Sequence, residues 1–228
     1  MAIDKKAKKS VIEDWRKSFP YLTSYAANKF YKLVGPVLIG LDVIKLPMSE
    51  EYRPHFVIYP LWRRDIRTCL DTPIIMKEFH DKKGFQYSIS YDRHSVFFAE
   101  VLEAIMKQTP LSLDEKSISL KKLIAVMNER STSPPLSRAP NSYLQAELMA
   151  SAFKAALFVS PKEAQIKLDE INKRNWDANN FKAFGFDVAN WLQDLRGQMD
   201  NREDFLRQIQ TNKLDRKVSQ LRASELTL

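Results

Sequence analysis

The strongest constraint on the fold is a ten-residue run, 37–46 (VLIGLDVIKL), that is apolar on both sides if it is extended. Pro36 and Pro47 flank the run, and proline is tolerated at strand ends because it lacks a backbone N–H. A strand with two apolar faces lies inside a sheet that is covered on both sides. We therefore expect this run to be a central strand between two layers.

The next segment, 52–62 (YRPHFVIYPLW), has the same character. Drawn as a strand, it divides its apolar and aromatic side chains between both faces. A platform that stacks nucleic-acid bases instead needs aromatic rings exposed on one wet face. We therefore interpret these aromatic residues as core. Only WRRDIR, residues 62–67, remains as a candidate contact surface.

Two further runs complete the predicted sheet. Residues 73–79 (PIIMKEF) are followed by the turn HDKKG and by residues 85–91 (FQYSISY), in which apolar and polar side chains alternate strictly. Strict alternation is typical of a strand with one wet face. Four consecutive runs with short connections predict an antiparallel meander of about four strands.

Helical periodicity surrounds this extended part. The first 19 residues place Val11, Ile12, Trp15 and Phe19 on one face, and Pro20 ends the run. After Asp92, an apolar stripe over 98–106 predicts one helix, and residues 118–129 predict another. The predicted fold class is α+β, with an N-terminal helix, the meander and a helical C-terminal region.

Three prolines in residues 131–141 (STSPPLSRAPN) predict a linker. It would join an α+β domain, 1–130, to a helical module, 142–228, although the module could also pack on the sheet as one domain. Ser142 and Ser160 each precede a Gln or Glu by three residues, as in a capping box. An apolar stripe over 181–195, closed by Gly197, predicts one long helix, and a further stripe continues to the C-terminus.

Charge and length bear on the partner and the compartment. The 228-residue chain has a net charge of +8. Half of this excess lies in residues 1–50, mainly in a lysine arm, Lys5, Lys6, Lys8 and Lys9. Such an arm is a candidate phosphate contact, or equally a solvated helix start. The single Cys69 excludes an internal disulfide, and no apolar run reaches transmembrane length. We expect a cytoplasmic protein with no membrane contact.

Common catalytic signatures are absent from the sequence. It has no GxxxxGK[ST], GxGxxG or GxSxG motif, and its single cysteine and three histidines lack zinc-site spacing. We therefore expect no cofactor and no metal site, and the sequence favours a protein that is not an enzyme.

The segment SYDRHS, 90–95, is the first catalytic candidate. It lies where the fourth strand is expected to lead into a helix, a place where anions bind. Asp92 and His94 would form an acid–base pair, and Arg93 would bind a phosphate or carboxylate. The simpler interpretation is that Asp92 caps the helix and His94 occupies its first turn.

A second candidate combines Asp71, Asp81 and Lys83, in the order seen in metal-dependent nucleases. That chemistry needs two carboxylates that hold Mg²⁺ and a lysine near the attacking water. Asp81 and Lys83, however, fall in HDKKG, which has the composition of a hairpin tip.

Two functions from different classes remain. The first is a non-catalytic, protein-binding factor, such as an accessory subunit or inhibitor-type partner, and its C-terminal helices could also form a homo-oligomer. The alternative is a nucleic-acid-associated protein that uses the lysine arm, Arg93 and the arginine cluster Arg63, Arg64 and Arg67. A metal-dependent nuclease or hydrolase is the second alternative.

Overall fold

The two apolar runs form the centre of the sheet in the computed structural model, which describes residues 5–228. They form strands β3 (Val37–Lys45) and β4 (Glu51–Pro60). The two strands pair antiparallel from Val37 opposite Pro60 to Lys45 opposite Tyr52. All of residues 37–43 are buried, which confirms that this strand is covered on both faces.

The sheet is larger than the predicted meander and is mixed. Its order is β5-β4-β3-β2-β8-β7, with β1 beside β2 and β6 beside β4. The meander from β2 to β5 is antiparallel, whereas β8 is parallel to both β2 and β7. The remaining strands are β1 (Thr23–Ala26), β2 (Lys29–Val34), β5 (Ile75–Glu78), β6 (Ile89–Ser90), β7 (Ser117–Ser119) and β8 (Ala223–Thr227).

The prediction of a strand over 85–91 is wrong for most of that segment. Only β6 is regular, and it pairs with β4 instead of with β5. Asp81 Oδ1 accepts hydrogen bonds from the backbone N–H groups of Lys83 and Phe85, which fixes a tight turn. β5 already pairs with residues 55–58 of β4, so the returning chain reaches β4 only at residues 51–52.

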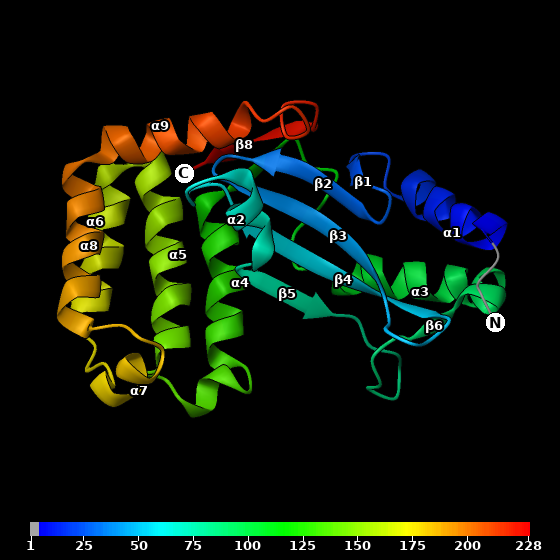
Figure 1. Ribbon diagram of the computed structural model, residues 1–228, viewed down its shortest axis with the longest axis horizontal. Coiled ribbons are helices and arrows are strands. Elements are labelled where there is room, and N and C mark those ends of the chain that lie inside the picture. The colour runs from blue at the N-terminus through cyan, green and yellow to red at the C-terminus, as the bar shows by residue number, and fades with distance from the viewer. Residues whose placement is uncertain (1–4) are drawn as a thin grey trace.

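Helices surround the sheet. Figure 1 shows α1 and α3 near one end of the long strands and α5, α6 and α8 near the other. The helices are α1 (Lys5–Ser18), α2 (Ile66–Asp71), α3 (His94–Gln108), α4 (Leu120–Thr132), α5 (Tyr143–Val159), α6 (Pro161–Asn172), α7 (Ala178–Ala183), α8 (Val188–Asp200) and α9 (Arg202–Lys213), with short 3-10 helices η1 (Tyr91–Arg93) and η2 (Leu136–Arg138).

The predicted N-terminal helix is confirmed over the described residues, and its first four positions lie outside them. Val11, Trp15 and Phe19 are buried, as the spacing predicts. The Trp15 ring meets that of Tyr52 edge-on, with centroids 6.3 Å apart. This contact joins α1 to the start of β4.

The single helix predicted over 181–195 is wrong, because the chain forms two helices there, α7 and α8. Gly185 between them has φ of +80°, a conformation that favours glycine. Asp187 then caps α8 by accepting a hydrogen bond from the Asn190 N–H. α8 continues past Gly197 to Asp200, so this glycine does not end a helix.

The predicted helical C-terminus is also wrong. α9 ends at Lys213, and the chain finishes in strand β8. Val218 and Leu221 are buried, but they belong to the turns between α9 and β8. β8 forms because β2 and β7 offer it hydrogen bonds on both sides, and such distant pairing leaves no local periodicity.

Of the two predicted capping boxes, Ser142 accepts a hydrogen bond from the Gln145 N–H, whereas Ser160 makes no side-chain cap. The Gln145 side chain donates instead to the carbonyls of Ser131 and Leu136. These bonds tie α5 to the segment 131–141, which includes the last turn of α4 and η2. The division into two domains and a linker stays a prediction.

Candidate functional site

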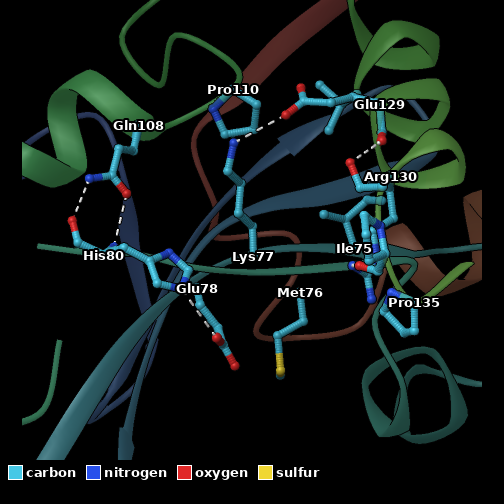
Figure 2. A pocket seen from close by; sticks show the side chains of 13 residues that line it. Ile75, Met76, Lys77, Glu78, His80, Gln108, Pro110, Glu129, Arg130 and Pro135 are labelled. Atoms are coloured by element: carbon cyan, nitrogen blue, oxygen red, sulfur yellow. Dashed lines mark hydrogen bonds and ion pairs between the residues drawn. The ribbon is translucent and has the colours of Figure 1, made fainter. Parts of the chain in front are cut away.

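Strand β5 ends the sheet on one side and borders a cleft. Within residues 5–228, it pairs with β4 and β4 alone. A cavity of about 640 Å³ runs beside it (Figure 2). One wall is residues 75–78 of β5 with His80, and the facing wall comes from α4 and residues 133–135. The site therefore combines an edge strand with a helix.

The cleft walls have mixed charge. Lys77 Nζ lies 3.5 Å from Glu129 Oε1 of α4, and His80 Nε2 lies 3.6 Å from Glu78 Oε2. Arg130 also lines the cleft. All four paired side chains are at least 35% exposed, so these ion pairs contribute little to stability. They remain accessible to a ligand with complementary charges.

The Gln108 side chain marks one end of this edge. Its Nε2 donates to the His80 carbonyl at 2.7 Å, and its Oε1 accepts from the His80 N–H at 3.0 Å (Figure 2). One amide side chain thus satisfies both backbone groups of His80, as a neighbouring strand would. The segment next to it, residues 75–78, has no such amide cap among the described hydrogen bonds.

The cleft lacks the arrangement of a nucleophile and a base. Its one hydroxyl, that of Ser133, donates to the Glu129 carbonyl at 2.7 Å. His80 is the only histidine in the lining, and its partner Glu78 is half exposed. Met76, 41% exposed, adds an apolar contact. The lining therefore combines charged and apolar side chains beside the edge strand.

The structure does not bring Asp92 and His94 together as an acid–base pair. Asp92 accepts a hydrogen bond from the Ser90 hydroxyl. His94 is buried, with Nδ1 2.6 Å from the Tyr52 hydroxyl and Nε2 3.1 Å from Asp14 Oδ2. Asp92 lies in η1 and makes no side-chain cap to α3, while His94 does occupy the first turn. His94 thus connects α1 to β4 and α3.

This environment predicts a pH-dependent stability. Burial lowers the pKa of His94, and the Asp14 carboxylate opposes that effect only in part. The unfolded chain therefore binds a proton near its ordinary pKa of about 6.5, where folded His94 stays neutral. The contribution of His94 to the free energy of unfolding is therefore fully present above this pH and is lost as the pH falls below it. Burial also lowers the pKa of His55, so this residue adds to the same pH dependence.

We expect the urea concentration at the unfolding midpoint of the wild type to decrease when the pH is lowered from 7.5 to 5.5. The decrease should be smaller for His94→Gln. His80→Gln is the matched control, because the His80 side chain is 44% exposed. Equal pH dependence in the wild type and His94→Gln would contradict this assignment.

The predicted basic residues lie in two separate places. α1 packs at the start of β4 through Trp15 and Tyr52, whereas the arginine cluster follows the end of β4. A strand of this length spans about 30 Å. Arg93 lies in η1, which contacts α1, the helix that carries the lysine arm. The lysine arm and the arginine cluster therefore do not form one continuous surface.

The arginine cluster is partly used by the fold itself. Arg63 Nη1 donates to the carbonyls of Thr68 and Thr72 at 2.9 and 2.8 Å. Arg64 pairs with Asp65, which caps α2 by accepting from the Thr68 N–H. Arg67 is exposed on α2. The segment 62–67 (WRRDIR) therefore leads from the end of β4 into the short helix α2.

The nuclease-like residues lie at opposite ends of β5. Asp71 ends α2 before this strand, and Asp81 begins the turn after it, with Lys83 in the same turn. Across the described residues, no cluster of three or more His, Cys, Asp or Glu side chains could hold a metal ion. The structure does not bring the two carboxylates together.

A buried carboxylate in the sheet was not singled out by the sequence patterns. Asp42 of β3 accepts hydrogen bonds from the hydroxyls of Tyr31 at 2.6 Å and Tyr59 at 2.9 Å, and Lys29 Nζ lies 3.8 Å away. Burial and the Asp42 charge raise the pKa of both tyrosines. Both carboxylate oxygens are thus engaged, and the group is 3% exposed. This network stabilises the sheet and is not open to a ligand.

The cleft residues come from three distant segments, 75–80, 108–110 and 126–135, so no local motif could reveal them. Comparison with protein families, curated proteins and solved structures finds no match to this chain. None of the helices within residues 5–228 has the length and apolar character needed to cross a bilayer.

Proposed function

We propose that the protein is a non-catalytic, protein-binding factor that takes an extended segment of its partner into the cleft beside β5. The supporting observation is a terminal strand that borders a cavity of about 640 Å³. A peptide can add as a strand to such an edge, with backbone hydrogen bonds for affinity and side-chain pockets for specificity. An accessory subunit or an inhibitor-type partner would bind in this way.

The charges of the cleft describe the segment it would bind. Lys77 and Arg130 offer positive charge, while Glu78 and Glu129 offer negative charge. A partner segment with both signs of charge would replace the weak, exposed pair between Lys77 and Glu129. Ile75 and Met76 would contact its apolar side chains.

Site-specific photocrosslinking in the native host tests this proposal. A photoreactive amino acid replaces Met76, and the control replaces Ile166 of α6, which is exposed to a similar extent, 44% against 41%. We expect a protein partner to be captured through position 76 and not through position 166. Hydrogen exchange of residues 75–78 should then slow when the purified partner is added.

Capture from both positions with equal yield would contradict binding at β5, as would unchanged exchange of residues 75–78. Recovery of nucleic acid alone would contradict the whole proposal.

Association with nucleic acid is the second proposal, and it is supported by the contact between α1, which carries the lysine arm, and η1, which carries Arg93. Each phosphate neutralised by such a surface releases counterions, so affinity should fall steeply as salt is raised. Fluorescence anisotropy with a labelled oligonucleotide at low and moderate salt measures this. A salt-independent signal, or none, would contradict it.

A further inference from the structure

The backbone beyond β5 shows which polar groups of this edge face a partner. In an antiparallel ladder, one residue directs both its N–H and its C=O to the neighbouring strand, and the next residue directs both away from it. The Phe79 carbonyl accepts a hydrogen bond from the Tyr87 N–H of the returning chain. The next residue, His80, directs both of its groups to the opposite side, where they meet Gln108.

The same alternation directs the backbone groups of Met76 and Glu78 away from β4, to the side that His80 faces. The pairing of β4 agrees with this direction. The Leu61 N–H donates to the carbonyl just before β3, so Phe56, an odd number of positions earlier, faces away from β3 and toward Lys77. Within residues 5–228, no hydrogen bond outside the β-ladders reaches a backbone group of Met76 or Glu78. Such open groups are a template for an added strand.

The Gln108 amide indicates the direction of that strand. Two residues of an antiparallel hydrogen-bonded pair exchange both N–H···O bonds with each other. Gln108 makes this double exchange with His80, at 2.7 and 3.0 Å. Its side chain thus takes the place of one residue of an antiparallel partner. A strand beside residues 75–79 would continue this pattern and would end where Gln108 begins.

The side chains of β5 alternate between two faces with different charge. In Figure 2, Lys77 extends toward Glu129 of α4, whereas Met76 and Glu78 extend the other way. Residues opposite each other on paired strands share a face and interact there. On the α4 face, Lys77 and Arg130 outnumber the single carboxylate of Glu129. This excess of positive charge favours an acidic residue opposite Lys77.

The other face favours a different pair of residues. The Glu78 side chain is 50% exposed, and its neighbour there is His80, at 3.6 Å. A basic residue opposite Glu78 would therefore form an ion pair. Met76 is an exposed apolar side chain on the same face, so an apolar residue opposite it would remove both side chains from water.

We infer that β5 accepts an extended peptide segment that runs antiparallel to it. From its N-terminus, the segment carries a basic, an acidic and an apolar residue, which lie opposite Glu78, Lys77 and Met76. The inference rests on the proposed function, and it adds the direction, the register and the side-chain pattern of the partner.

Three synthetic peptides test this pattern by NMR titration of the full chain, up to millimolar concentration. They are acetyl-TKEVT-amide, its charge-swapped form acetyl-TEKVT-amide and its reversed form acetyl-TVEKT-amide. We expect TKEVT to bind about tenfold more tightly than TEKVT, because two cross-strand pairs change from opposite to like charge. The reversed peptide should also bind more weakly.

Binding of TKEVT should slow the hydrogen exchange of the Met76 and Glu78 N–H groups more than that of the Lys77 N–H, which faces β4. Equal affinities of TKEVT and TEKVT, or no change at Met76 and Glu78, would overturn the inference. Tighter binding of TVEKT would overturn the antiparallel direction.

A charge reversal in the protein tests the pairing itself. The double variant Lys77→Glu with Glu78→Lys should prefer TEKVT over TKEVT. The matched control is Lys167→Glu with Glu170→Lys, which reverses an ion pair on α6 outside the cleft and should keep the wild-type preference. An unchanged preference in the β5 variant would overturn the assignment of the two charges.

These results are separable from the test of the proposed function. Capture of a protein partner through position 76, together with equal affinities of the peptides, would support the proposed function and overturn the side-chain pattern. Preference for TKEVT without capture of any partner through position 76 would support the pattern and contradict the proposed function.

Discussion

Replacing Gly40 by alanine is expected to lower the free energy of unfolding by at least about 3 kcal/mol. A Cβ at this position would overlap the Phe30 carbonyl oxygen and lie 2.9 Å from Tyr31 Cα. Both atoms belong to the backbone of β2, which pairs with β3 at this point. Backbone atoms cannot rotate away, so relief would require the two central strands to separate.

Gly197→Ala is the control for this substitution. Its new Cβ would meet no atom within 4 Å, and Gly197 lies inside α8. Alanine costs less conformational entropy than glycine in a helix, so this variant should gain about 0.5–1 kcal/mol. Urea unfolding followed by circular dichroism measures both variants. A small effect of Gly40→Ala, comparable with that of Gly197→Ala, would contradict the close approach of β2 and β3.

Replacing Asp42 by alanine is expected to cost about 3 kcal/mol, because it leaves two buried hydroxyls without their acceptor. Tyr31 is fully buried and Tyr59 is 3% exposed, so neither hydroxyl can turn to solvent. The variant also removes the carboxylate nearest to Lys29 Nζ. The loss should appear as a lower urea midpoint.

Asp200→Ala is the comparison for Asp42→Ala, since Asp200 is exposed at the end of α8. Surface substitutions of this kind change stability by about 0.5 kcal/mol or less. Equal urea midpoints for the two alanine variants would show that the tyrosine network around Asp42 does not stabilise the sheet.

The features that could be predicted from the sequence are those that short-range patterns encode. The run 37–46 is apolar on both faces, and such a strand is stable only in the middle of a covered sheet. The spacing of Val11, Trp15 and Phe19 likewise predicts the buried face of α1, which the structure confirms. The alternation over 85–91 led to a wrong prediction of strand pairing. Alternation of apolar and polar residues indicates which face of a strand is exposed to solvent, but it does not indicate which strand pairs with it.

The candidate site could not be predicted, for a related reason. Gln108 reaches His80 across 28 positions of the chain, and Glu129 reaches Lys77 across 52. Arg63 looked available for phosphate, yet it donates to two carbonyls of its own segment. Residue type shows what chemistry a side chain offers, while its partners depend on which segments meet.

The amino-acid sequence by itself therefore determined the α+β class, the two central strands and the burial of their aromatic residues. These features follow from the spacing of apolar residues within short segments, which can be recognised without knowing which segments meet. The tertiary structure alone decided that β5 ends the sheet, that β8 returns beside β2, and that His94 faces Asp14 and Tyr52. These features rest on hydrogen bonds between distant segments, and the energy of such bonds depends on the folded arrangement that brings their partners together.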